Sequence, residues 1–101
     1  LLIKIFKESF HNCTNLKNIN LENCKELEHI GTDAFSYCNL ESVTIPNSVI
    51  TIKEGAFESL SDVEEGCNPN LQNVNLPRRF EQKISKIFGE RSNAINFTFT
   101  D

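Results

Sequence analysis

The side chains that could do chemistry in this chain are its cysteines and histidines. Cysteine and histidine together bind zinc, but only at spacings such as Cys-x-x-Cys that bring several ligands to one point. None of the four cysteines has such a neighbour, and neither histidine extends a cysteine pair into a zinc pattern. We therefore expect packing roles for the cysteines, solvated positions for the histidines, and neither a cofactor nor a catalytic site. The residues concerned are Cys13, Cys24, Cys38, Cys67, His11 and His29.

A group of carboxylates, Asp62, Glu64 and Glu65, invites a calcium interpretation. A calcium loop alternates its oxygen ligands and turns sharply at a glycine, as in Asp-x-Asp-x-Asp-Gly. The stretch lacks that alternation, so we predict an exposed acidic loop instead. Two interpretations of the loop remain open. It contacts a partner, or it is a tolerated insertion, because lengthening a loop costs little.

Length and charge exclude two further classes of function. The chain has 101 residues, 39% of them apolar, which is enough for one domain or a piece of one. Its formal charge of −4 argues against nucleic acid, because phosphate binding needs a basic surface. No apolar run approaches the ~18 residues that a membrane span requires, so we expect no direct membrane insertion.

The elements that position these side chains come from a two-part internal repeat. One part ends in phenylalanine, with isoleucine five residues before it, and the other has leucine-x-x-(Ile/Val)-x-(Leu/Ile) after an asparagine. Repeats of about 20–30 residues with this spacing predict a solenoid of stacked coils. The first part occurs as "LIKIFKESF" (2–10), "LEHIGTDAF" (27–35) and "VITIKEGAF" (49–57), and the second as "CTNLKNINL" (13–21), "CNLESVTIP" (38–46) and "CNPNLQNVNLP" (67–77).

Alternation within the second part predicts short parallel strands with one buried and one solvated face. Ile19 and Leu21 point to the interior, so Asn18 and Asn20 point outward. The phenylalanines at 10, 35 and 57 should stack as one column inside the coil, each burying a large apolar area.

The asparagine that precedes each strand leucine suggests a ladder at the turns. Asn15, Asn39 and Asn70 occupy this position in the three units. We expect their side-chain amides to satisfy backbone groups that the turns leave unpaired.

The stretch "NLESVTIPNSVITIKEGAF" (39–57) resembles the Treponema-type, or BspA-like, leucine-rich repeat, including Pro46, Ala56 and Phe57. The resemblance covers residues 2–77, although the first unit lacks the proline. It implies a curved solenoid within a larger protein, adhesion or protein binding without catalysis, and a cell-surface or secreted location. Since residues 1–10 begin midway through a unit, we also expect further repeats on the N-terminal side, in the same chain.

The C-terminal segment changes to a helical period. We divide the chain into repeats over residues 1–77, about three units open at the N-terminus, and a capping segment over residues 78–101. Within that segment we predict a helix over about 79–88, ended by Gly89, and a strand over about 94–99. A helix lying on a membrane surface is the competing interpretation.

A protein-interaction surface is the leading functional hypothesis. The outward strand positions form the concave face of the solenoid, which is neutral and rich in hydrogen-bonding groups. A structural scaffold or stalk in a large intracellular assembly is the alternative, in which all four cysteines stay reduced. The partner, the compartment and any glycosylation at Asn12 or Asn96 are left open. The predicted protein-binding residues are Asn18, Asn20, Ser42, Thr44, Asn73 and Asn75, with Lys17, Glu41 and Gln72 at the rim.

Overall fold

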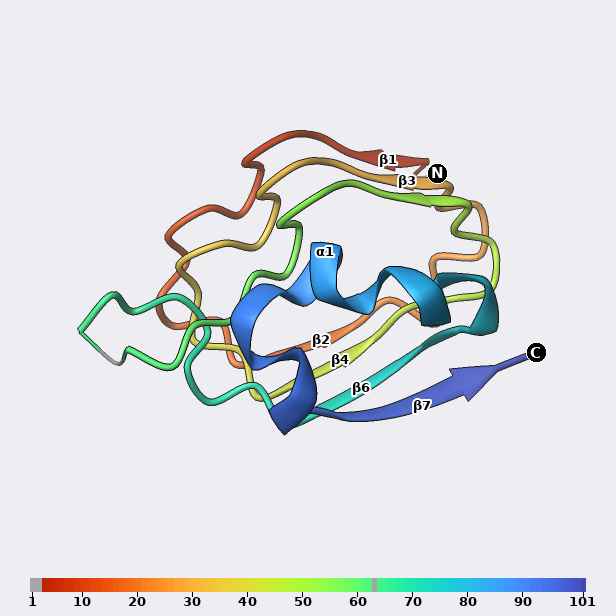
Figure 1. Cartoon of the computed structure of the whole chain (residues 1–101). Helices are drawn as coiled ribbons and strands as arrows, with labels where there is room; N and C mark the ends of the chain where they lie inside the picture. Colours follow the sequence, from red (N-terminus) through yellow and green to blue (C-terminus); the bar gives the residue numbers. More distant parts are fainter. Residues whose placement is uncertain (1–2, 63) are drawn as a thin grey trace.

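The computed structural model describes residues 3–62 and 64–101. The chain winds into stacked coils, and each full coil gives one short strand to each of two parallel sheets, so the predicted repeat solenoid is confirmed (Figure 1). The upper sheet in Figure 1 has the order β1-β3-β5 and the lower sheet the order β2-β4-β6-β7. The strands are β1 (Lys4–Ile5), β2 (Asn18–Asn20), β3 (His29–Ile30), β4 (Ser42–Thr44), β5 (Thr51–Ile52), β6 (Asn73–Pro77) and β7 (Asn96–Thr100).

Two rows of branched and aromatic side chains line the interior between the sheets. In the upper sheet the paired inward residues are three isoleucines, and in the lower sheet they are Ile19, Val43, Val74 and Phe97. Branched side chains suit a pleated surface because their χ1 angles are already restricted. No coil could bury such a row alone, so each coil depends on its neighbours.

The phenylalanine column exists as predicted. Phe10 stacks on Phe35 with ring centroids 5.0 Å apart, and Phe35 stacks on Phe57 at 4.9 Å, with the rings parallel to within 7°. The expectation that every ring is buried is wrong for Phe10, which is 41% exposed, whereas Phe57 is fully buried. The reason is geometric, since Phe10 ends the stack and has a ring on only one side.

Backbone hydrogen bonds between the phenylalanine turns hold neighbouring coils in register. The N–H of Phe10 donates to the carbonyl of Ala34 (2.8 Å), and the N–H of Phe35 donates to the carbonyl of Ala56 (2.8 Å). The Phe57 N–H makes the corresponding bond to Ile87 (3.2 Å). Equivalent residues of successive coils therefore lie directly above one another.

The segment after β6 covers the interior at the C-terminal end of the stack (Figure 1). It consists of the 3₁₀ helix η1 (Arg78–Lys83), the helix α1 (Ile84–Phe88), the 3₁₀ helix η2 (Gly89–Ala94) and β7. The single helix predicted over 79–88 is thus divided at Lys83, whose φ of −120° is not helical. Gly89 ends α1 with a positive φ of 72°, a conformation that glycine adopts without strain.

The C-terminal segment also continues the phenylalanine column of the repeats. Phe88 stacks on Phe57 at 5.8 Å, so it forms the fourth rung of the column, and Phe97 meets Phe88 edge to face at 5.0 Å. Residues 78–101 therefore act as a modified coil in which a helix replaces the upper strand.

The predicted role of the asparagine ladder is wrong, because a different asparagine performs it. Among the side-chain hydrogen bonds of the described residues, Asn70 bonds only to Asn39 (3.4 Å), and no backbone group is involved. Asn68 is fully buried and bonds three backbone groups instead. Its side-chain oxygen accepts from the Leu40 N–H, and its side-chain amide donates to the carbonyls of Phe35 and Glu58. The side-chain amide of Asn68 lies in the interior and can reach the backbone groups that the turns leave unpaired. The side chain of Asn70 does not reach them, because Asn70 is exposed.

We predict that replacing Phe57 by alanine destabilises the chain much more than replacing Phe10. Phe57 lies between two rings, so its loss opens a cavity and costs about 3–5 kcal/mol of unfolding free energy. Phe10 has one stacked face, and its loss should cost about 1–2 kcal/mol. Urea denaturation followed by circular dichroism measures both values. Equal losses for the two variants would contradict the column.

Candidate functional site

The outward residues of the lower sheet form two straight rows of uncharged polar side chains, which we call the polar face. Strand pairing puts Asn18 opposite Ser42 and Ser42 opposite Asn73. It likewise aligns Asn20, Thr44 and Asn75 in the second row. The structure thus brings together the six residues that the sequence predicted.

β7 extends both rows by one strand, which the sequence analysis missed. Asn96 pairs with Asn73, and Thr98 pairs with Asn75. The signal was present, because the strand predicted near 94–99 has Phe97 and Phe99 inward and therefore Asn96 and Thr98 outward.

Hydrogen bonds within the polar face hold the first row and leave much of the second available. The Ser42 hydroxyl donates to the Asn18 side-chain oxygen (2.7 Å), and the Asn96 amide donates to that of Asn73 (3.5 Å). In the second row no hydrogen bond within the described part of the chain engages the side chains of Thr44, Asn75 or Thr98. These groups can therefore bond to a ligand.

The predicted rim residues form a third row beside the polar face. The N–H of Glu41 donates to the carbonyl of Lys17, and the N–H of Gln72 donates to that of Glu41, so the three lie in register. All three side chains are exposed. The rim adds one positive and one negative charge, and the polar face itself carries none.

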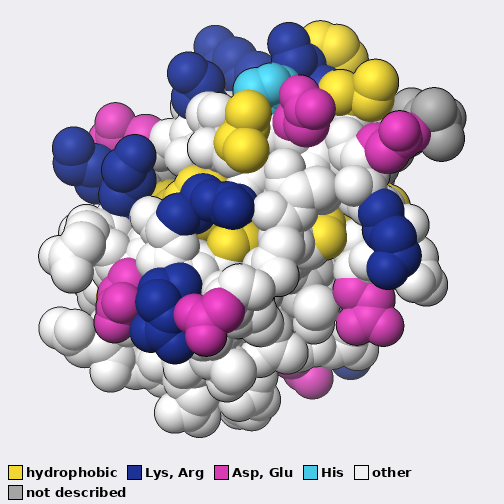
Figure 2. All heavy atoms as spheres, turned by 90° about the vertical axis from the view of Figure 1, so that its right-hand side faces the viewer, with side chains coloured by type: hydrophobic (Ala, Val, Ile, Leu, Met, Phe, Trp, Pro, Cys, Tyr) yellow, Lys and Arg dark blue, Asp and Glu magenta, His cyan; other side chains and the backbone are white. Residues whose placement is uncertain are grey.

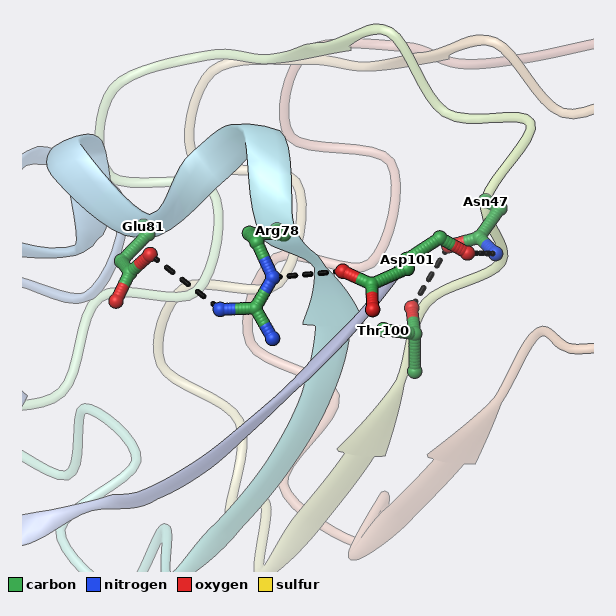
Figure 3. Close-up of polar contacts among 5 residues, drawn as sticks. All are labelled: Asn47, Arg78, Glu81, Thr100 and Asp101. Atoms are coloured by element: carbon green, nitrogen blue, oxygen red, sulfur yellow. Dashed lines mark hydrogen bonds and ion pairs between the residues drawn. The ribbon is translucent and has the colours of Figure 1, made fainter.

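A cluster of polar contacts ties β7 to the rest of the lower sheet (Figure 3). Thr100 donates to the Asn47 side-chain oxygen (2.7 Å), and the Asn47 amide donates to the Asp101 carbonyl (2.9 Å). Arg78 donates to the Asp101 carboxylate (2.7 Å) and lies 3.7 Å from Glu81. The hydrogen bond that Arg78 donates to Asp101 raises the pKa of the Arg78 guanidinium, which stays charged. The anchored end of β7 holds the fourth pair of polar residues in place.

The acidic loop lies apart from the polar face. It projects from the side of the phenylalanine turns, at the left of Figure 1. The Asp62 carboxylate accepts the Glu64 N–H (2.9 Å), a local bond that closes a turn, and Glu65 is exposed. Hydrogen bonds from the Ser61 side chain and from the Ser61 N–H (2.9 Å) lower the pKa of Glu90 in η2. The contact role of Asp62, Glu64 and Glu65 remains a prediction.

Comparison with protein families gives a match over nearly the whole chain. The family described as "BspA type Leucine rich repeat region (6 copies)" matches residues 2–101. The chain belongs to this family. Comparisons with curated proteins and with solved structures give no match.

Membership confirms the resemblance that the sequence indicated and extends it through the C-terminal segment. BspA-type leucine-rich repeats are typically non-catalytic protein-interaction modules. This points to a protein as the partner of the present chain. Within residues 3–62 and 64–101, no helix is long and apolar enough to cross a membrane.

The cysteines of these BspA-type coils are free thiols. Cys38 and Cys67 are buried, and Cys13 and Cys24 are partly buried. The Cys38 thiol donates to the Phe10 carbonyl (3.0 Å), and the Cys67 sulfur accepts the Tyr37 N–H (3.3 Å). Burial raises the pKa of both buried thiols, that of Cys67 to about 11. Protonated, enclosed thiols are poor nucleophiles, as their packing role requires.

The histidines contact neighbours at the surface of the BspA-type coils. His11 meets Tyr37 edge to face with centroids 5.2 Å apart, and His29 lies 3.7 Å from Glu28. Among the described residues, no three His, Cys, Asp or Glu side chains lie close enough to hold a metal ion.

Replacing Cys67 by alanine should change how stability depends on pH. Because its folded-state pKa of about 11 exceeds the ordinary 9.0, Cys67 keeps its proton longer in the folded state. Its stabilising contribution is therefore complete below pH 9 and is lost as the pH approaches 11. Urea titrations between these values should show a steeper decline for the parent chain than for Cys67→Ala. Parallel declines would mean that the thiol is not shielded.

Proposed function

We propose that the chain is a protein-binding module of a larger BspA-type protein and that it binds through the polar face. The observation that supports this most is the alignment of eight uncharged polar side chains in two rows across four strands. Neighbouring strands are about 4.8 Å apart, so each row offers one hydrogen-bonding group at that interval. A segment that lies across the strands can bond to several coils at once.

The chemistry of the polar face favours modest affinity per coil. Strong binding sites in protein interfaces are usually aromatic or arginine side chains in enclosed pockets. The polar face has neither, so affinity must accumulate over several coils. This requirement suits adhesion through a long array, and we place the parent protein at the cell surface or outside the cell.

We further propose that more repeats of the same chain lie beyond the Phe10 end. That end exposes an apolar hollow of about 540 Å³, lined by Ile5, Phe6, Phe10, Leu16 and Ile19 among others. Another coil with a phenylalanine at the matching position would cover Phe10 as Phe57 covers Phe35. The open end also supports the alternative of a scaffold or stalk, in which stacking of coils is itself the function.

Substituting three residues of the polar face by glutamate should abolish binding. The variant Asn18→Glu/Thr44→Glu/Asn73→Glu introduces charges that are not direct cross-strand neighbours, so it should remain folded. In the test, the parent chain and the variant are each used to recover partner proteins from the native source. Each recovered partner is then titrated calorimetrically with both chains.

The matched control is Thr14→Glu/Asn15→Glu/Asn93→Glu, which changes the same residue types at exposed positions outside both rows. It should bind like the parent chain. If the polar-face variant also binds undiminished, the polar face is not the binding surface.

The mass of the protein in its native source tests the proposal of further repeats. We expect a mass well above the 11.5 kDa of this chain, with BspA-type units in the additional sequence. An intact mass of 11.5 kDa would contradict it.

A further inference from the structure

The upper sheet carries a lysine-rich surface on the side of the molecule opposite the polar face. Lys4 and His29 are paired in its outward row, and Lys53 and Lys7 follow β5 and β1. Lys83 and Lys86 continue the surface onto the helices that cover the stack, since they line a hollow together with Thr51 and Lys53. We call this surface the lysine face. It consists of Lys4, Lys7, His29, Lys53, Lys83 and Lys86.

The charge of the lysine face is opposite to that of the chain as a whole. It gathers five of the ten Lys and Arg residues, although the net charge is −4. Carboxylates also lie beside it, among them Glu8, which follows Lys7, Glu28, which lies 3.7 Å from His29, and Glu54, which lines the hollow with Lys83 and Lys86. Dark-blue side chains gather along the top of Figure 2, which is the side of the upper sheet in Figure 1.

Apolar side chains lie among these lysines. Phe6 is 68% exposed, and the Lys4 ammonium lies 5.6 Å from the centre of its ring. Ile50, next to β5, is 56% exposed. Hydrophobic side chains also appear beside the basic ones at the top of Figure 2. Exposed aromatic and aliphatic groups within a charged patch are typical of an interaction surface.

The lysine face has a hollow at Gly31. A Cβ at this position would lie 2.5 Å from the Lys7 backbone nitrogen and 2.8 Å from the Phe6 carbonyl carbon. The close approach of the two coils at this point therefore requires glycine. The hollow has a volume of about 340 Å³, and Phe6, Lys4 and Lys53 are among the residues that line it.

We infer that the lysine face binds an acidic segment of a partner protein, with an apolar side chain of that segment in the hollow at Gly31. The flanking carboxylates of the segment pair with Lys4, Lys7 and Lys53, and the apolar side chain packs on Phe6. Charge complementarity determines this choice, because a basic surface attracts acidic peptides. Two lysine faces repel each other, and two copies that each carry a net charge of −4 repel each other as wholes.

An anionic membrane fits the lysine face less well than a peptide. A bilayer would press its headgroups on the whole surface, so Glu28 and Glu54 would meet lipid phosphates as closely as the lysines do. A peptide places its carboxylates only where lysines lie. Because the lysine face and the polar face belong to different sheets, the chain could bind two partners at the same time.

The test is fluorescence anisotropy at low ionic strength with a fluorescein-labelled peptide in which glutamates flank a single phenylalanine. The parent chain should bind it, and binding should weaken as salt is added. Lys4→Glu/Lys53→Glu should lower the affinity by on the order of ten-fold or more. Lys17→Glu/Lys25→Glu, with the same charge change away from the lysine face, should alter it less than about two-fold.

Two further measurements test the electrostatic part and the apolar part of this inference separately. A peptide with glutamine in place of glutamate should not bind, and Phe6→Ser should weaken binding of the original peptide. If a charge-reversal variant loses its circular dichroism spectrum, Lys4→Gln/Lys53→Gln takes its place with the same expected direction. The inference is overturned if the parent chain does not bind the peptide, or if both lysine pairs matter equally. It is also overturned if the chain binds phosphatidylserine–phosphatidylcholine vesicles through Lys4 and Lys53 but not the peptide.

Discussion

A coil of this solenoid can bury its interior only if the next coil presents a side chain of the same size at the same height. The phenylalanine column meets this constraint. Phe35 and Phe57 are enclosed because each has a ring on both sides, and Phe88 supplies the last ring from a helix rather than from a strand turn. The backbone bonds between successive turns repeat with the same spacing as the rings. Stacking and hydrogen bonding therefore impose one register on the whole molecule.

Both candidate binding surfaces are consequences of that register. Once equivalent residues of successive coils lie directly above one another, their outward side chains form straight rows. Each row consists of the residues that occupy one position of the repeat in successive coils. The lower sheet thus presents asparagine, serine and threonine, and the upper sheet presents lysine, histidine and threonine. Each surface would lose its order if a coil slipped by one residue, because every side chain would then change faces.

Much of the architecture was predictable because it depends on local periodicity. The alternation around Ile19 indicated which side chains face inward, and the recurrence of phenylalanine indicated the column. The capping segment was harder, since Phe88 belongs to a helical pattern and its equivalence to Phe57 appears only when backbone bonds are traced. Asn68 was missed for a related reason. It follows an insertion that displaces it from the aligned positions, so only its burial and its three backbone bonds identify its role.

The surfaces were predictable to different degrees. Six residues of the polar face followed from strand alternation, and Asn96 and Thr98 would have followed had the last strand been assigned to the same sheet. The lysine face could not be read from the sequence. Its members are scattered from Lys4 to Lys86 and come together only through the stacking of three coils and a helix.

The most direct test of the account is a double-mutant cycle between Phe35 and Phe57. Leucine at each position keeps the interior filled while removing the stacked pair. If the rings stabilise the register by contact, the free-energy effects of the two substitutions, measured by urea denaturation, should be non-additive by about 0.5–1.5 kcal/mol. Effects that add within about 0.3 kcal/mol would show that the rings are energetically independent, and the column would then not be what aligns the coils.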